Sequence, residues 1–310
     1  MSLRAGILFA GLCCAVAVAA TAGETMALRL RWHKGRRHVW RVFVREHGTG
    51  IDDEDFTSVY GLRYVANVLE VAADGSASVA FSYDAVYHKY DHANMSFEVN
   101  STDRGDAAAA GMGLASLALV DERVVARVTA GGEVKELTGA EEALANMHDK
   151  LRGYGEQGWL QPANVAFFSG IYKLLYTPAL QREQLRCLVS HPPPEPVAAG
   201  AHWRVAMEEG GAWPLVQTST LTLAGDVGDG LVKLEGTERL ASPADPARSV
   251  ELAFDDHRTV TWHYDSALKG TGTSTYLVER ETGLLRSCRG EVEIEGKAGR
   301  AYAGEVPLKP

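Results

Sequence analysis

Residues 138–190 read TGAEEALANMHDKLRGYGEQGWLQPANVAFFSGIYKLLYTPALQREQLRCLVS, and no other long stretch of the chain has the pattern of helices. Thr138 is followed three residues later by Glu141, which is the spacing of a capping box at a helix start. Apolar residues then recur at helical spacing, and Gly153 and Gly155 indicate a stop. The stretch therefore predicts a first helix that begins at Thr138 and ends before the glycine pair.

Two further helical pieces follow in the same stretch. An apolar run extends from Val165 to Leu175, and a third piece opens with Thr177 and Pro178, a cap followed by proline at the first helical position. It runs to about Leu188, and the prolines of residues 192–196 forbid helix beyond it. We expect a helical insert over residues 138–190.

The helical insert allows two roles. The simpler one is to cover a β-sheet with an apolar face. The alternative is that the aromatic and aliphatic residues of the second helix line or fill an apolar ligand cavity. The residues that would form this ligand site are Phe167, Phe168, Ile171, Leu174 and Leu175.

The first 22 residues have the features of a signal peptide. Arg4 supplies the positive start, residues 7–18 the apolar run, and residues 20–22 a small-residue cleavage site. The apolar run is short for a membrane span, so an uncleaved anchor is the weaker alternative. We expect a secreted, periplasmic or extracellular protein that keeps no stable transmembrane anchor after cleavage.

Cleavage would leave two cysteines, Cys187 and Cys288. Exported chains pair cysteines readily, and this bridge would join the end of the helices to the last strands. Two free buried thiols are an equal alternative, because sequence gives no distance between the two residues.

The formal net charge of −9 indicates that the chain does not bind nucleic acid and does not dock electrostatically on anionic lipid. Positive charge is concentrated near the N-terminus, on Arg29, Arg31, Lys34, Arg36, Arg37, Arg41 and Arg45. Residues two apart on a strand share a face. The sequence favours a solvated strand face there, with contact to an anion or a glycan as the alternative.

β-like sequence lies on both sides of the insert, in residues 23–137 and 191–310. In the first part we expect two strands within residues 27–47 around Lys34-Gly35, a strand over 57–73, and a hairpin at Asp74-Gly75. The next strand alternates, and the side chains expected on one face are Ala77, Val79, Phe81, Tyr83, Ala85 and Tyr87. Further strands are expected near residues 121–130, 133–137, 201–208, 214–224, 230–239, 248–256, 258–265, 273–280 and 284–295.

The two β parts share short sequence patterns in the same order. GRRHVWRV at 35–42 resembles GAHWRV at 200–205, and VAADGSASV at 71–79 resembles VGDGLVKL at 227–234. We therefore expect an antiparallel, mainly β (α+β) protein with two similar halves, either as one curved sheet or as tandem sandwiches.

The order of motifs resembles a family of bacterial exported proteins classed as a domain of unknown function. The matching segments are WHKG at 32–35, GEVKELTG at 132–139 followed by EEAL at 141–144, PEPVAAGAHW at 194–203, GTG at 270–272 and TGL at 282–284. Ala201 replaces the acidic residue that usually follows the glycine in this family. The resemblance implies export and a fold, and it supplies no catalytic residues.

The densest group of polar side chains is HKYDH at residues 88–92. His88 and His92 share one strand face with Tyr90 between them, and together with Asp91 they suggest a Zn²⁺ or Cu²⁺ site that takes its third ligand from elsewhere. The simpler interpretation is a pair of exposed histidines at a strand end.

Other chemistry has little support in the sequence. No G-x-S-x-G elbow and no glycine-rich phosphate loop occurs, so the sequence predicts no cofactor. Asn94 and Asn100 begin glycosylation sequons.

We rank three functions from these features. A non-catalytic envelope or extracellular protein that binds a ligand or partner comes first. A lipid or lipopeptide carrier with an apolar cavity under the helices comes second, and a metal-dependent hydrolase third.

Overall fold

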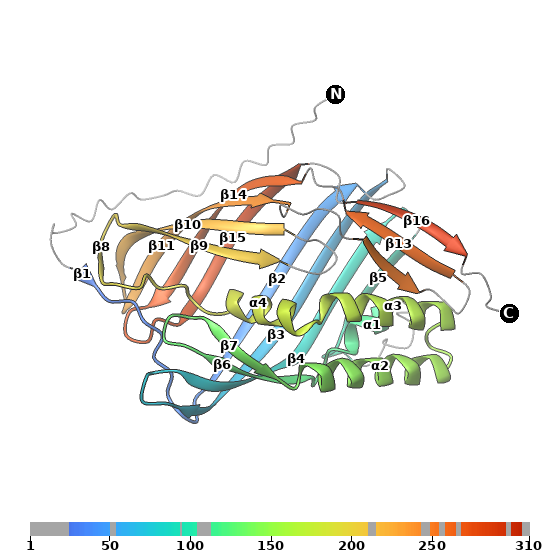
Figure 1. Ribbon diagram of the computed structural model, residues 1–310, viewed down its shortest axis with the longest axis horizontal. Coiled ribbons are helices and arrows are strands. Elements are labelled where there is room, and N and C mark those ends of the chain that lie inside the picture. The colour runs from blue at the N-terminus through green and yellow to red at the C-terminus, as the bar shows by residue number, and fades with distance from the viewer. Residues whose placement is uncertain are drawn as a thin grey trace.

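The computed structural model describes residues 25–49, 54–93, 95–103, 113–209, 215–242, 249–253, 258–264, 268–295 and 299–305 (Figure 1). The expected signal peptide, residues 1–22, lies outside them. No described helix is both long enough and apolar enough to span a membrane. The described chain is mainly β, with antiparallel sheets and few helices, as the sequence predicts.

The N-terminal sheet contains six antiparallel strands. Five follow the order β2-β3-β4-β6-β7, and β5 pairs with the far end of β4. Asp74-Gly75 turns β3 into β4 with Gly75 at positive φ, as the hairpin signal indicates. The strands are β2 (Arg37–Thr49), β3 (Asp55–Val71), β4 (Ala77–His92), β5 (Met95–Asn100), β6 (Arg123–Val128) and β7 (Val134–Thr138).

The C-terminal part forms a second antiparallel sheet in the order β15-β14-β11-β10-β9. Its strands are β9 (His202–Glu209), β10 (Leu215–Gly228), β11 (Leu231–Ala241), β14 (Lys269–Glu279) and β15 (Leu285–Glu295). A three-stranded sheet is made of β12 (Ser249–Ala253), β13 (Arg258–Tyr264) and β16 (Gly299–Glu305), and β1 (Thr25–Met26) pairs with β8 (Val197–Ala198).

The helices are α1 (Leu114–Leu117), α2 (Ala140–Glu156), α3 (Pro162–Leu175) and α4 (Pro178–Cys187). Thr177 caps α4 by accepting a hydrogen bond from the Leu180 N–H, as predicted. The predicted cap of α2 is wrong, because Thr138 ends β7 and a left-handed Gly139 starts the helix. Helix α2 passes Gly153 and ends at Glu156, one residue after Gly155, so the predicted stop lies close to the observed end.

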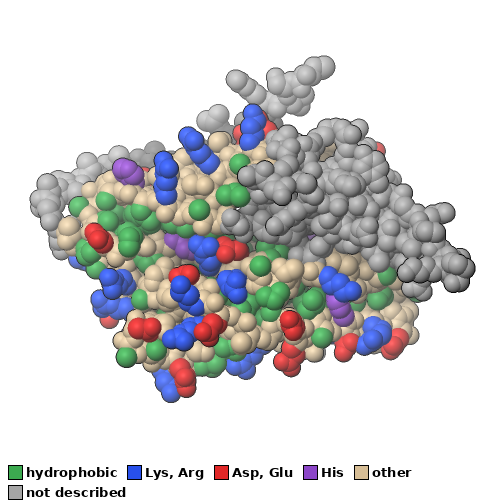
Figure 2. All heavy atoms as spheres, viewed as in Figure 1, with side chains coloured by type: hydrophobic (Ala, Val, Ile, Leu, Met, Phe, Trp, Pro, Cys, Tyr) green, Lys and Arg blue, Asp and Glu red, His purple; other side chains and the backbone are tan. Residues whose placement is uncertain are grey.

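Helices α2 and α3 lie over the long strands β3 and β4 (Figure 1). The largest cluster of buried side chains fills the layer between them, and it includes Phe81 of β4, Met147 and Leu151 of α2, and Leu185 of α4. On the visible outer face, charges of both signs intermingle over the helices and the β6–β7 hairpin (Figure 2). The helices therefore bury one apolar side against the sheet.

The segment before β2 departs from prediction. Residues 27–34 form no strand of the sheet, although Leu28, Leu30 and Trp32 are buried. Leu28 packs in the core of the C-terminal sheet and Leu30 in the main core. We call residues 27–32 the N-terminal strap, because it joins the two cores. It bonds to turns instead of pairing with a strand, through Leu30 N–H to Ala130 O at 2.9 Å and Arg31 N–H to Thr282 O at 2.7 Å.

A β-bulge in β4 changes which side chains face the core. Arg63 pairs with Ala85 but the next residue, Tyr64, pairs with Tyr83, so Asp84 is extra. A one-residue shift moves all following side chains to the other face. Tyr83 is buried as predicted, whereas the predicted placement of Ala85 and Tyr87 on the same face is wrong. Val86 is buried in their place.

The two pairs of similar segments, together with a third and fainter pair at residues 130–134 and 281–285, fall at equivalent places in the two sheets. Each sheet is a five-stranded meander once insertions are set aside. Each pair of similar segments covers equivalent turns of the two meanders. Each turn has a glycine at positive φ, in the pairs Gly35 and Gly200, Gly75 and Gly230, and Gly132 and Gly283. Only glycine adopts this conformation without strain.

Candidate functional site

Five tyrosines meet between the N-terminal sheet and α3. Four of them are almost fully buried, and the fifth, Tyr60, is partly buried against the same core. We call them the tyrosine cluster: Tyr60 and Tyr64 of β3, Tyr83 of β4, Tyr172 of α3, and Tyr176 at the end of α3. Tyr60 and Tyr64 face inward because β3 alternates without a break between them, and Tyr83 joins them across the strand pair.

The rings of the tyrosine cluster form a chain of contacts. The ring centroids of Tyr64 and Tyr83 lie 5.1 Å apart, those of Tyr83 and Tyr176 lie 6.2 Å apart, and those of Tyr172 and Tyr176 lie 5.3 Å apart. The last two pairs meet edge to face, an arrangement that stabilises aromatic pairs beyond the area they bury. The cluster therefore fixes α3 on the sheet.

The hydroxyl groups of the cluster are neutral and only partly paired. Burial raises the pKa of all five tyrosines, so each keeps its proton. The Tyr172 hydroxyl donates to the Ala115 carbonyl, and the nearby Tyr176 side chain slightly offsets the rise in the pKa of Tyr60. Among the described residues we find no hydrogen bond for the hydroxyls of Tyr64 and Tyr83. Neither hydroxyl is among the fully enclosed polar atoms that lack a partner, so both keep some accessible surface.

His88 lies beside the cluster. Its ring meets that of Tyr60 edge to face at 5.1 Å and that of Phe97 at 4.9 Å, and its Nδ1 lies 2.8 Å from the Ser116 hydroxyl. Burial lowers the pKa of His88 to about 4, so the imidazole is neutral near pH 7. The arrangement holds α1 on β4, and a neutral imidazole next to a hydroxyl is also the first part of a nucleophilic pair.

The structure places the predicted metal ligands on two opposite faces of β4. His88, Tyr90 and His92 share the inward face, and Tyr90 stacks between Phe56 and Phe97. Asp91 lies on the opposite face of β4, where it is exposed. Within the described residues, no group of three His, Cys, Asp or Glu side chains is placed to hold a metal ion.

The predicted ligand residues of α3 are half-buried as far as their side chains are described. Phe167 and Phe168 contact each other at 5.3 Å between ring centroids, and Phe168 packs against the main core. Ile171 is half-buried, and Leu174 and Leu175 lie on the last turn. Every side chain from Ala163 to Ile171 is half-buried, so the helix has no fully exposed and no fully buried side over these residues.

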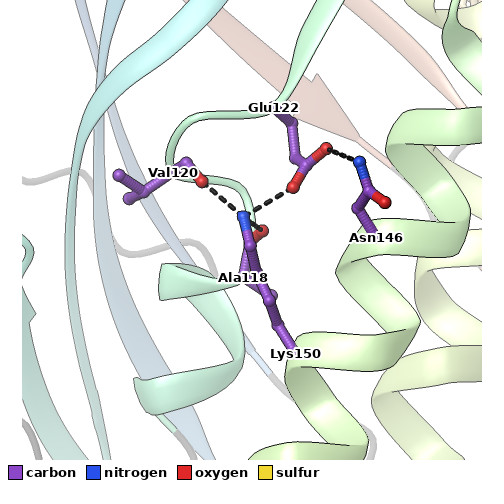
Figure 3. A network of polar contacts seen from close by, with 5 residues as sticks. All are labelled: Ala118, Val120, Glu122, Asn146 and Lys150. Carbon is purple, nitrogen blue, oxygen red and sulfur yellow. Dashed lines mark hydrogen bonds and ion pairs between the residues drawn. The ribbon is translucent and has the colours of Figure 1, made fainter.

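An ion pair between α2 and the segment after α1 holds the part of the chain that supports the tyrosine cluster (Figure 3). The Lys150 ammonium of α2 donates to the carbonyls of Ala118 and Val120 and pairs with the Glu122 carboxylate at 2.5 Å. The Asn146 amide donates to the other oxygen of Glu122 at 3.2 Å. These contacts hold the segment after α1, and with it the Ala115 carbonyl that Tyr172 reaches.

A second buried polar group lies in the C-terminal sheet, and the sequence analysis missed it. Glu238 of β11 is only 2% exposed. Its carboxylate accepts hydrogen bonds from the hydroxyls of Ser219 and Ser274, from the Gln217 amide at 3.0 Å, and from the Tyr276 hydroxyl at 3.4 Å. Four donors satisfy the buried charge, which is the pattern of a structural network.

Residues 74–285 match the model of a family described as Family of unknown function (DUF6263). The chain belongs to this family. No curated protein and no solved structure matches the chain. The DUF6263 region contains most of the candidate site, namely Tyr83, His88, Ser116, Tyr172 and Tyr176, whereas Tyr60 and Tyr64 precede it.

The remaining predicted residues are two cysteines and two asparagines. Within the DUF6263 region, Cys187 ends α4, and Cys288 lies on β15 just beyond it. No disulfide bond joins them, and both side chains are exposed instead of buried. Asn100 is exposed at the end of β5, where its side-chain oxygen accepts hydrogen bonds from Thr102. Asn94 lies outside the described residues.

Two buried histidines predict how stability depends on pH. Burial lowers the pKa of His191 to about 4, with Arg186 adding to the effect, and the pKa of His88 falls equally. An unfolded histidine binds its proton near pH 6.5. The two neutral histidines therefore make their full contribution to the free energy of unfolding above about pH 7. We expect this contribution to be lost as pH falls from about 6.5 to about 4.

Urea unfolding at a series of pH values measures this loss. We expect His88→Asn to flatten the fall in the free energy of unfolding, by up to about 1.4 kcal/mol per pH unit. The exposed His202→Asn serves as the control and should keep the wild-type slope. An unchanged slope in His88→Asn would contradict the buried neutral imidazole.

Proposed function

We propose that this chain is an exported, non-catalytic binding protein that holds a small apolar ligand with a hydrogen-bond acceptor beside α3 and the tyrosine cluster. The observation that carries this proposal is the pair of hydroxyls of Tyr64 and Tyr83, for which no hydrogen-bond partner is found among the described residues. A ligand acceptor placed there would supply the missing hydrogen bonds.

The character of α3 supports an apolar ligand. It is the most apolar of the three long helices, and its side chains from Ala163 to Ile171 are half-buried on all sides. An apolar helix is normally enclosed by its own protein. Partial exposure on every side leaves apolar surface that a ligand body can cover. A lipid or lipopeptide has this combination of a long apolar part and an acceptor-bearing head.

Tyr83→Phe gives a direct test, because it removes one hydroxyl and keeps the ring. We expect the free energy of unfolding of the ligand-free variant to change by less than about 1 kcal/mol, because the lost hydroxyl makes no hydrogen bond to the described residues. We expect it to bind cis-parinaric acid, a fluorescent fatty acid, roughly tenfold more weakly, since one hydrogen bond is lost. Urea unfolding and fluorescence titration measure the two effects.

Tyr87→Phe is the matched control for this test. Tyr87 lies on the opposite face of the same strand, where its hydroxyl donates to Glu98 at 3.0 Å. Its change should leave affinity for the fatty acid unaltered. Mass spectrometry of solvent extracts from the purified protein should detect a bound apolar molecule. A clean extract together with no binding of the fatty acid would reject the proposal.

A hydrolase is the second candidate, favoured by the 2.8 Å contact between His88 Nδ1 and the Ser116 hydroxyl. A neutral histidine beside serine fits a nucleophile and base. The metal-dependent form would instead use His88 and His92, which share one face of β4. Labelling by a fluorophosphonate that Ser116→Ala abolishes would support the serine form, and stoichiometric zinc or copper by elemental analysis the metal form. Absence of both results would remove this candidate.

We also propose that the two meanders arose by duplication of one unit. The three turn glycines at positive φ in equivalent places support this, as does the shared strand order. Independent profiles of each half, built from other members of the family, should align β2 with β9 and β7 with β15. An alignment in another register would contradict the duplication.

A further inference from the structure

The outward face of β2 carries an unusual alternation. Arg37, Val39, Arg41, Phe43 and Arg45 all point away from the core and are all exposed, with Val39 43% and Phe43 67% exposed. We call these five residues the arginine row. The opposite face of the same strand carries Trp40 and Val42, which pack against the main core. The arginine row therefore lies on the other side of the sheet from the tyrosine cluster.

The arginines of the row differ from three paired cations of this sheet. Arg63, Lys89 and Arg127 each form an ion pair, with Asp84 at 2.6 Å, Glu98 at 3.2 Å and Glu136 at 4.0 Å. Arg37, Arg41 and Arg45 form no ion pair with any residue in the described parts of the chain. Three uncompensated positive charges thus stand in line on a protein whose formal net charge is −9.

Phe43 is exposed but held in place. It lies across from Gly61 of β3, and a Cβ atom at Gly61 would lie 2.7 Å from Cε1 of the Phe43 ring. One edge of the ring therefore occupies the space that a side chain at position 61 would fill. A ring fixed before binding loses little conformational entropy when a ligand covers it. Because position 61 is glycine, the Phe43 ring is already in place before a ligand binds.

We propose that the arginine row binds an acidic polysaccharide chain. At about 3.3 Å per residue along a strand, the three guanidinium groups recur roughly every 13 Å over a row about 26 Å long. Guanidinium groups bind carboxylate or sulfate with two parallel hydrogen bonds. The apolar C–H faces of sugar rings then cover Phe43 and Val39, as aromatic side chains favour.

The shape and charge of the row favour this partner over other polyanions. The row is one strand wide, which suits a linear chain more than a membrane plane. Single-stranded nucleic acid needs several aromatic platforms for its bases, whereas the row carries one aromatic ring, that of Phe43. The inference goes beyond the ligand site proposed above and does not depend on it.

Binding of the full chain to polygalacturonate and to heparin, measured over a series of NaCl concentrations, tests the proposal. We expect binding at low salt that weakens as salt rises. The triple variant R37Q/R41Q/R45Q should lose roughly tenfold or more in affinity and most of the salt dependence. Phe43→Ala should lose several-fold in affinity while keeping the salt dependence, because the charges remain.

The matched control is R152Q/R204Q/R289Q, which removes the same charge from exposed positions on α2, β9 and β15. It should bind as the wild type does. Circular dichroism melting confirms that each variant is folded. Equal weakening in the control, no binding of either glycan at low salt, or tighter binding of duplex DNA or phosphatidylglycerol vesicles would each overturn the proposal.

Discussion

Gly283→Ala is expected to lower the free energy of unfolding by about 3 kcal/mol or more. Gly283 turns β14 into β15 with a φ of +66°, where any other residue costs about 1 to 2 kcal/mol. A Cβ atom there would also overlap the Arg29 carbonyl and approach Leu30 N to 3.0 Å. The N-terminal strap would have to move, and Leu28 and Leu30 would leave the two cores that they join.

Gly230→Ala separates the two costs. Gly230 has a similar φ of +72° in the turn between β10 and β11, but a Cβ atom there meets nothing within 4 Å. We expect a loss of only about 1 to 2 kcal/mol, from backbone strain alone. Urea unfolding of both variants gives the comparison. Equal losses would mean that the close approach of the strap to this turn contributes nothing to stability.

Lys150→Met is the second change with a large expected effect. It keeps the apolar stem of the side chain but removes the ammonium group that pairs with Glu122. Glu122 is 4% exposed, so its carboxylate would stay buried with only the Asn146 amide as a side-chain partner. Leaving a buried charge unpaired typically costs 3 to 5 kcal/mol, and we expect about 3 because Lys150 is itself partly exposed.

Two further variants identify the cause of that loss. Lys135→Met breaks the exposed pair with Glu133, and we expect a change below about 0.5 kcal/mol. Lys150→Met combined with Glu122→Leu should recover most of the stability, because an apolar pair replaces the ions. If the double variant is as unstable as Lys150→Met alone, the two carbonyl hydrogen bonds of Lys150 matter more than the unpaired carboxylate. Urea unfolding of all three variants decides between these results.

Local sequence signals predicted the turns and most strands, because each depends on residues close in the chain. Asp74-Gly75 and the Thr177-Pro178 start of α4 are such signals. For the N-terminal strap, the local signals gave a wrong prediction. Leu28, Leu30 and Trp32 alternate as a strand does, yet their partners are the turns at Ala130 and Thr282, far away in sequence.

The candidate site was predicted only in fragments. His88 and the apolar residues of α3 were singled out separately, and the structure places His88 beside Tyr60, under the same helix layer. The five tyrosines come from two strands and one helix, so no spacing in the sequence joins them. The bulge at Asp84 also reverses the faces of β4, and alternation alone carries no sign of an extra residue.

The sequence by itself determined the mainly β character, the helical middle and the turn positions, because hydrophobic periodicity, proline and glycine act over a few residues. Only the tertiary structure decided which polar groups lost their water. Tyr64, Tyr83, Glu122 and Glu238 are ordinary residues in the sequence. Their chemistry follows from burial between elements that the chain brings together over long distances, since desolvation depends on all neighbours in space and not on neighbours in sequence.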